Sequence, residues 1–129
     1  MANSSVQAAK KVLQTEADGL GKLQDNLPID FSDLVNLIIN LSGRVIVSGV
    51  GKSGHIGNKI AATLASTGTP SYFVHATEAS HGDLGMITDQ DLCLLISNSG
   101  ETIEMFDILT HARRFSIPVA TMSSNCESL

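Results

Sequence analysis

A run of polar side chains follows a continuously apolar stretch, residues 92–96, in the second half of the chain. Ser97, Asn98, Ser99 and Thr102 all lie within this run. In open α/β sheets, ligands bind where the chain leaves the carboxyl ends of the strands. Hydroxyl groups and the free amides at the start of a helix suit a phosphate monoester and require no metal. Because a helix N-cap would explain only one of the two serines, we predict a phosphate-ester site in this loop.

A second loop of interest is rich in glycine and follows the apolar residues 45–47. Residues 49–54 read G-x-G-x-x-G, the fingerprint of dinucleotide binding. That fingerprint also requires an acidic residue about 20 positions later, but no acidic residue lies between Asp33 and Glu78. Lys52 and Ser53 resemble the end of a nucleotide-binding P-loop, yet Ile46 stands where its first glycine belongs. The sequence therefore disfavours both NAD binding and nucleoside triphosphate hydrolysis.

The same loop is typical of an anion site at the start of a helix, where backbone amides and the helix dipole attract negative charge. Residues 34–77 contain Arg44, Lys52 and Lys59 and no acidic residue. Lys52 would add charge and Ser53 a hydroxyl group. The alternative is that the glycines only form a tight turn, but the lysine and serine favour phosphate or sugar-phosphate binding.

The spacing of apolar residues predicts the elements that must position these loops. Continuous apolar runs indicate strands that are buried on both faces of a parallel sheet. Strands that alternate with helices indicate an α/β fold. We expect helices over residues 6–27, about 30–41, 55–67 and 102–114, strands over 45–47, 71–74, 92–96 and 117–122, and a polar loop with a short helical turn over 75–85.

Composition excludes several classes of protein. The 129 residues suffice for one domain, and 43% hydrophobic with 16% charged residues argues against disorder. A net charge of -5 without a basic run argues against general nucleic-acid binding. We find neither a membrane-spanning stretch nor a signal peptide, and we expect a cytoplasmic protein. Cys93 and Cys126 cannot form a disulfide framework, so we expect reduced thiols, with Cys93 in the core.

Taken in order, the motifs resemble a known family. GVGKSGHIG at 49–57, STGTPSYFVHATEASHGDLGM at 66–86 and SNSGET at 97–102 resemble the sugar isomerase (SIS) domain, and most closely that of arabinose-5-phosphate isomerases. The resemblance implies a three-layer, doubly wound parallel sheet. Residues 1–42 would form an N-terminal helical hairpin that packs in a dimer, and residues 43–129 the sugar-phosphate-binding core. Family members continue through a fifth strand and usually two CBS domains, so we expect a chain truncated after its fourth strand.

The resemblance also implies an activity, the interconversion of D-arabinose 5-phosphate and D-ribulose 5-phosphate through an enediolate. This reaction feeds the synthesis of Kdo, a lipopolysaccharide sugar. The family's catalytic residues correspond to Lys52, Glu104 and His81. Its substrate contacts correspond to Ser53, Gly68, Thr69, His75, Ser97, Asn98, Ser99 and Thr102.

The resemblance implies no required cofactor. A divalent metal such as zinc can bind at His75 in the family, and we expect such binding to be inhibitory. The family assembles as tetramers of SIS dimers whose active sites share residues between subunits. We therefore expect a sugar-phosphate substrate and self-association, with no nucleic-acid or membrane partner.

The chemistry of the residues fits this reaction. Glu104 follows Glu101 by one helical turn, and its carboxylate could move a proton between C1 and C2. Lys52 could stabilise the enediolate or assist ring opening, and His81 could shuttle a proton. Two alternatives stay open: another SIS isomerase such as a phosphoheptose isomerase, and a non-catalytic SIS domain that senses a sugar phosphate.

Three further polar residues have simpler interpretations. Asp89 and Asp91 flank a turn before the third strand, and we expect both to be surface acids. His111 lies beside Arg113 and Arg114, and we expect a solvated helix end that favours the helix dipole.

Overall fold

The computed structural model describes residues 2–125, so Cys126 lies outside the described residues. Contacts divide the chain into two units, residues 1–33 and 34–129. The first unit contains helix α1, Ala2–Asp25. Helix α2, Phe31–Ile39, begins near the boundary and leads into the second unit. No helix within residues 2–125 combines the length and apolarity needed to cross a bilayer.

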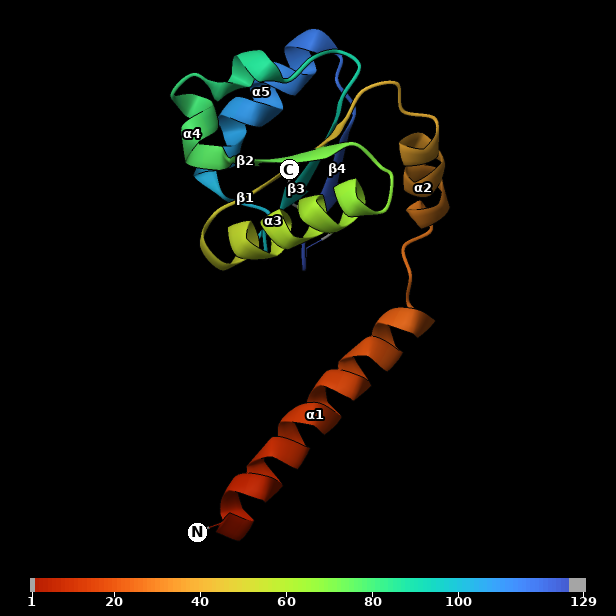
Figure 1. Cartoon of the computed structure of the whole chain (residues 1–129), viewed down its shortest axis with the longest axis vertical. Helices are drawn as coiled ribbons and strands as arrows, with labels where there is room; N and C mark the ends of the chain where they lie inside the picture. The colour runs from red at the N-terminus through yellow and green to blue at the C-terminus, as the bar shows by residue number, and fades with distance from the viewer. Residues whose placement is uncertain (1, 126–129) are drawn as a thin grey trace. The chain divides into compact units, whose positions relative to one another are not determined.

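The second unit is built on a parallel sheet of four strands in the order β2-β1-β3-β4 (Figure 1). The strands are β1 Val45–Gly49, β2 Ser71–His75, β3 Leu92–Ile96 and β4 Val119–Met122. Helix α3, Gly51–Ser66, covers one face, and α4, Ala76–Ser80, and α5, Phe106–Phe115, cover the other. Two 3₁₀ turns, η1 Asp83–Met86 and η2 Ile103–Met105, complete the unit. The predicted three-layer α/β fold is confirmed.

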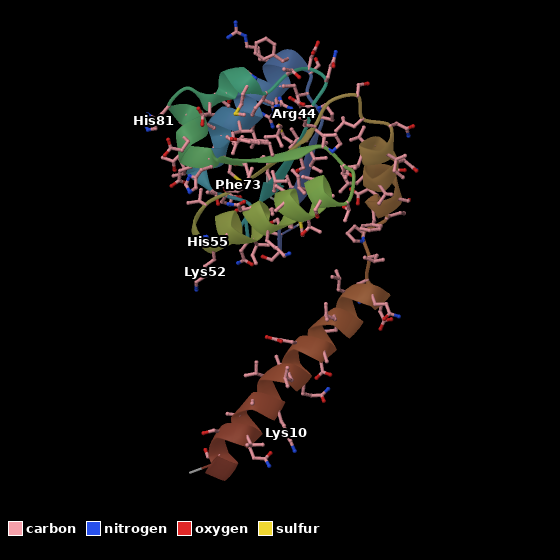
Figure 2. The ribbon with its side chains drawn as sticks, in the orientation of Figure 1. Lys10, Arg44, Lys52, His55, Phe73 and His81 are labelled. Carbon is pink, nitrogen blue, oxygen red and sulfur yellow. The ribbon has the colours of Figure 1, made fainter. Side chains whose placement is uncertain are left out.

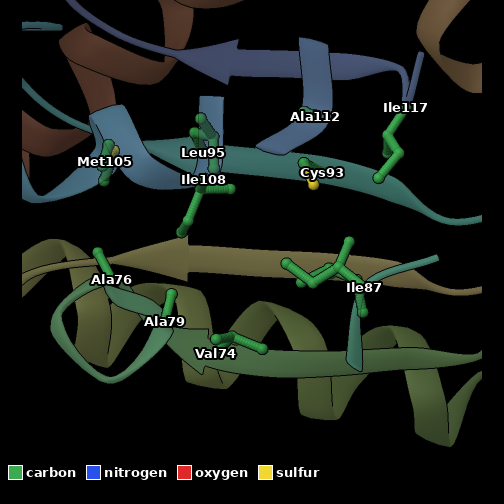
Figure 3. Close-up of a cluster of buried hydrophobic side chains, with 11 residues drawn as sticks. Val74, Ala76, Ala79, Ile87, Cys93, Leu95, Met105, Ile108, Ala112 and Ile117 are labelled. Carbon is green, nitrogen blue, oxygen red and sulfur yellow. The ribbon is translucent and has the colours of Figure 1, made fainter. Parts of the chain in front are cut away.

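Alternation along the strands divides the core into two clusters, one on each face of the sheet. Ile46, Cys93 and Leu95 face α4 and α5 and pack against residues such as Ala79 and Ile108 (Figure 3). The neighbouring strand positions face the other way, toward α3 and α2. Both faces of β1 and β3 are therefore buried, as the continuous apolar runs predicted. Cys93 is fully buried in this core, as predicted, and that burial raises the pKa of its thiol to about 12.

Glycines allow α3 to start close to the end of β1. A side chain at Gly49 would place its Cβ 2.9 Å from the backbone carbon of Ser53. One turn later, a Cβ at Gly57 would lie 3.0 Å from the Phe73 ring. Gly51 has a φ of 58°, which glycine adopts at no steric cost. The helix thus begins at Gly51, four residues earlier than predicted, and Lys52 and Ser53 lie in its first turn.

The opposite, amino-terminal end of the sheet contains an ion pair with a buried carboxylate, and it corrects two predictions. Asp91 is 1% exposed, and its carboxylate contacts the Arg44 guanidinium at 3.0 Å. It also accepts hydrogen bonds from the amides of Arg44 at 2.7 Å and Thr88 at 2.9 Å. The expectation of a surface acid at Asp91 was wrong, because the start of β1 supplies its partner. Arg44 likewise adds no charge to the glycine-rich loop, since it lies far from Lys52 (Figure 2).

His111 is a further correction. The side chain is half-buried, its Nε2 lies 3.2 Å from the Ile87 carbonyl oxygen, and its ring packs against Phe115 with centroids 4.7 Å apart and planes tilted by 49°. It is therefore a packed residue between α5 and the segment after η1, and the expectation of a solvated helix end was wrong.

Candidate functional site

The two predicted loops lie at the carboxyl ends of neighbouring strands. Gly49 of β1 and Ile96 of β3 are directly paired, so the residues after each begin side by side. The chain then turns to α3 on one face and to α5 on the other. This divergence is the topological switch point of the sheet, where open α/β folds bind their ligands. The structure therefore brings Ser53 and Ser97–Thr102 to one edge of the sheet.

The start of α3 presents free backbone amides. Its N-cap, Val50, supplies no side-chain hydrogen bond, and the first amides of a helix have no partner within the helix. Lys52 is exposed and Ser53 half-buried in this turn. Lys52 and His55 both lie at this end of α3 (Figure 2). Amide donors next to a free ammonium group form a site suited to an anion.

Hydrogen bonds within the serine loop hold Ser97 and Thr102 together. Ser97 is 7% exposed, and its hydroxyl lies 2.6 Å from the Thr102 hydroxyl. The same oxygen accepts a hydrogen bond from the Gly100 amide at 3.0 Å. These two hydroxyl groups are thus fixed in place before any ligand binds. They also have a structural role, since they tighten the loop.

Ser99 and Asn98 form the outer part of the same loop, and both are exposed. The Ser99 hydroxyl accepts a hydrogen bond from the Glu101 amide at 3.2 Å, so it closes a turn and caps no helix. The Asn98 carbonyl oxygen accepts one from the Ser124 amide at 3.1 Å. The sequence analysis did not single out Ser124. The sequence signal that could have identified it is its position two residues after β4, the strand that pairs with β3.

Glu104 lies in η2 and is exposed. The predicted helix from residue 102 instead begins at Phe106, after this 3₁₀ turn. Glu101 therefore precedes any helix, and the expectation that it shares a helical face with Glu104 was wrong. Glu104 still follows the serine loop directly, and next to it Ile103 is 78% exposed.

The two predicted histidines stand at the two ends of α4. His75 is its N-cap and accepts a hydrogen bond from the Thr77 amide through Nδ1. His81 is its C-cap and is exposed. Figure 2 shows His81 well separated from Lys52. The structure thus places His75 at the carboxyl edge of the sheet but does not bring His81 to Lys52.

Gly68 and Thr69 lie at the other end of the sheet. They follow α3 and precede β2, with Gly68 at a φ of 99° and the Thr69 amide bonded to the Leu64 carbonyl. Because α3 runs from the carboxyl edge back to the amino edge, these residues are on the side of the Arg44–Asp91 pair. Within this chain they do not meet the serine loop.

The pocket at the serine loop is too small to enclose a sugar. The hollow beneath Ser97 and Gly100 measures about 20 Å³ and is lined mainly by apolar residues such as Leu95 and Met105. That is room for about one water molecule. Within residues 2–125, no three His, Cys, Asp or Glu residues are grouped so as to hold a metal ion.

Comparison with known proteins agrees with this geometry. The SIS domain model matches residues 38–128. The chain belongs to the SIS domain family. Arabinose 5-phosphate isomerase KdsD of Yersinia pestis is 56% identical to this SIS domain over 122 residues, which are 95% of this chain and 37% of KdsD. KdsD of Pseudomonas aeruginosa is 48% identical over 95% of this chain and 38% of its own.

A solved structure also resembles this SIS domain closely. The E. coli CFT073 protein c3406, in complex with arabinose 5-phosphate, superposes with a TM-score of 0.92 at 39% identity, covering 98% of this chain and 67% of that one. The chain spans little more than a third of the length of the KdsD relatives, 37% in the Yersinia protein.

Proposed function

We propose that this SIS domain belongs to an arabinose-5-phosphate isomerase, an enzyme that interconverts D-arabinose 5-phosphate and D-ribulose 5-phosphate for Kdo synthesis. The proposal rests on one observation. The two loops that we expect to bind phosphate, one at the start of α3 and one after β3, meet at the switch point between β1 and β3. The identity of 56% to a KdsD isomerase supports the choice of substrate. The free thiol at Cys93 is compatible with the cytoplasmic location that we also propose.

In this proposal the phosphate is bound by the serine loop and the start of α3. Ser97 and Thr102 are already oriented by their mutual hydrogen bond, while Ser99 and the Asn98 side chain are exposed to the ligand. Lys52 lies in the first turn of α3 and stabilises the negative charge of the enediolate. An anchored phosphate fixes the distance from the loop to C1 and C2 of the sugar.

Glu104 is the proposed base for the proton at C1 and C2, because it follows the phosphate loop directly and has a free carboxylate. His81 is the proposed proton shuttle to the sugar oxygens. General acid–base steps of this kind contribute roughly 10²–10⁴-fold each. Neither step requires a cofactor.

We further propose that the active site is completed by a second copy of the chain. Gly68, Thr69 and His81 are predicted site residues, yet they lie away from Lys52 within one chain. If the second subunit supplies these three residues to the site of the first, the prediction agrees with where they lie in the chain. The exposed apolar residues of α1 offer a surface for such self-association.

Proton exchange at C2 tests the proposal. Arabinose 5-phosphate is incubated in D₂O with the chain, with the full-length protein and with the E104Q variant of each, and followed by proton NMR. We expect loss of the C2 proton signal and appearance of ribulose 5-phosphate, slowed at least about 100-fold by E104Q. Line broadening of arabinose 5-phosphate without exchange in the full-length protein would instead indicate a sugar-phosphate sensor. Sedoheptulose 7-phosphate is tested in the same way. Proton exchange with this sugar but not with arabinose 5-phosphate would indicate a phosphoheptose isomerase.

A further inference from the structure

The ring of His75 is held by two contacts at the end of β2. Its Nδ1 accepts a hydrogen bond from the Thr77 amide at 3.3 Å. Its ring also meets the edge of Phe73, with ring centroids 6.4 Å apart and planes at 80°. Phe73 in turn packs on α3, where it approaches Gly57. The half-buried imidazole therefore has a defined orientation.

This geometry fixes the tautomer of the neutral imidazole. A ring nitrogen that accepts a hydrogen bond carries no proton, so the proton resides on Nε2. Nε2 is then a donor and has no lone pair for a metal ion. A metal on Nε2 would move the proton to Nδ1, where it would face the Thr77 N–H, and the cap would be lost.

The surroundings of His75 do not supply a metal site either. Zinc in proteins takes three or four ligands from Cys, His, Asp and Glu. Within residues 2–125 no group of three such residues is close enough to form one. The residues present therefore do not fit the divalent metal that the family resemblance implied at His75.

The cap instead relates His75 to His81, because the two residues stand at opposite ends of α4. Helix α4 has five residues, too few to be stable by itself. Ala76 and Ala79 are buried at 0% and 1% exposure and fasten it to the core, and His81 ends it. We infer that His75 is a positioning residue, which caps α4 and thereby holds His81, and that it is not a metal ligand. The functional part of this inference, the role of His81, rests on the proposed isomerase.

Two NMR measurements test the structural part without any activity assay. Long-range proton–nitrogen spectra at about pH 8, above the usual range of histidine titration, should show the Nε2–H tautomer for His75. Adding one equivalent of Zn²⁺ should leave the His75 signals in place. A predominant Nδ1–H tautomer, or a His75 signal that shifts first with zinc, would overturn the inference.

A pair of variants separates the cap from the imidazole. Asparagine caps helices well and alanine does not. We expect H75A to speed exchange of the Thr77 amide about fivefold, whereas H75N restores the protection of that amide toward wild type. Equal loss of amide protection in the two variants would refute the cap. If amide protection follows this pattern but the protein shows no isomerase activity, the cap is supported and the proposed function is rejected.

Discussion

At the scale of single residues, Asp91 is held by several hydrogen bonds at once. Its carboxylate accepts hydrogen bonds from Arg44 and Thr88 and is almost fully buried. Removing one member of such a pair leaves the other charge uncompensated. We expect D91N to lower the free energy of unfolding by about 2–4 kcal/mol, less than a fully buried pair would lose because Arg44 is 39% exposed. Urea denaturation measures the change.

Asp89 provides the matched control for this variant. It is an exposed aspartate two residues away, and the same change at an exposed site is usually worth under about 0.5 kcal/mol. If D89N and D91N lowered stability equally, the ion pair would not be the cause.

The same pair predicts a pH dependence. Burial pushes the pKa of Asp91 upward, but hydrogen bonds from Arg44 and Thr88 outweigh it and hold the pKa below its ordinary value. The unfolded chain then binds a proton at higher pH than the folded one. This contribution to stability is therefore complete above about pH 4 and is lost as the pH falls through the lower, folded pKa. Urea midpoints measured from pH 6 downward should fall more steeply for wild type than for D91N; parallel curves would contradict the assignment.

At the scale of elements, the strands could be predicted because they are continuously apolar and follow clear breaks. The start of α5 could not, because it depends on the hydroxyl pair of Ser97 and Thr102, which closes the loop into a 3₁₀ turn. The burial of Asp91 was equally hidden, since its partner Arg44 lies 47 positions earlier in the sequence. Local patterns thus predicted the order of the elements and the edge where the loops meet. They did not reveal contacts that form only after the sheet assembles.

The start of α3 yields a prediction at this scale. A Cβ at Gly49 would lie 2.9 Å from backbone atoms of Ser53, which cannot rotate away as a side chain could. We expect G49A to shift the start of α3 and to cost about 1–3 kcal/mol of stability. Phosphate binding by the amides of that turn should weaken in parallel, as measured by titration of arabinose 5-phosphate.

Gly85 is the control for this substitution, because nothing lies within 4 Å of the position its Cβ would take. G85A should change stability by less than about 0.5 kcal/mol. Unchanged stability and binding in G49A would show that the close approach of α3 to β1 is not required.

At the scale of the whole molecule, α1 carries a row of exposed apolar side chains. Val6, Leu13, Leu20 and Leu23 are between 52% and 69% exposed, at spacings of seven, seven and three residues, as in a heptad pattern. Such spacing is typical of a helix that packs along another helix. Two glycines also weaken α1, and a solitary helix of this kind is marginal in water. The stripe therefore indicates a packing partner.

Charge along α1 favours a second copy in the antiparallel orientation. Lys10 and Lys11 make the first half basic, whereas Glu16, Asp18 and Asp25 outnumber Lys22 in the second half. An antiparallel pair sets each basic half against an acidic half. We expect the wild-type chain to sediment as a dimer or larger, and the L13K/L20K double variant to dissociate into monomers, because it places two charges in the apolar stripe.

The control for this variant adds one lysine outside the stripe. Q7K lies on α1 at an exposed polar position and should leave the sedimentation coefficient unchanged. If the active site is completed by a second copy, L13K/L20K should also lose proton exchange at C2, while Q7K keeps it. Dissociation without loss of exchange would mean that one chain holds the whole site. Association that survives L13K/L20K would assign the interface to another surface.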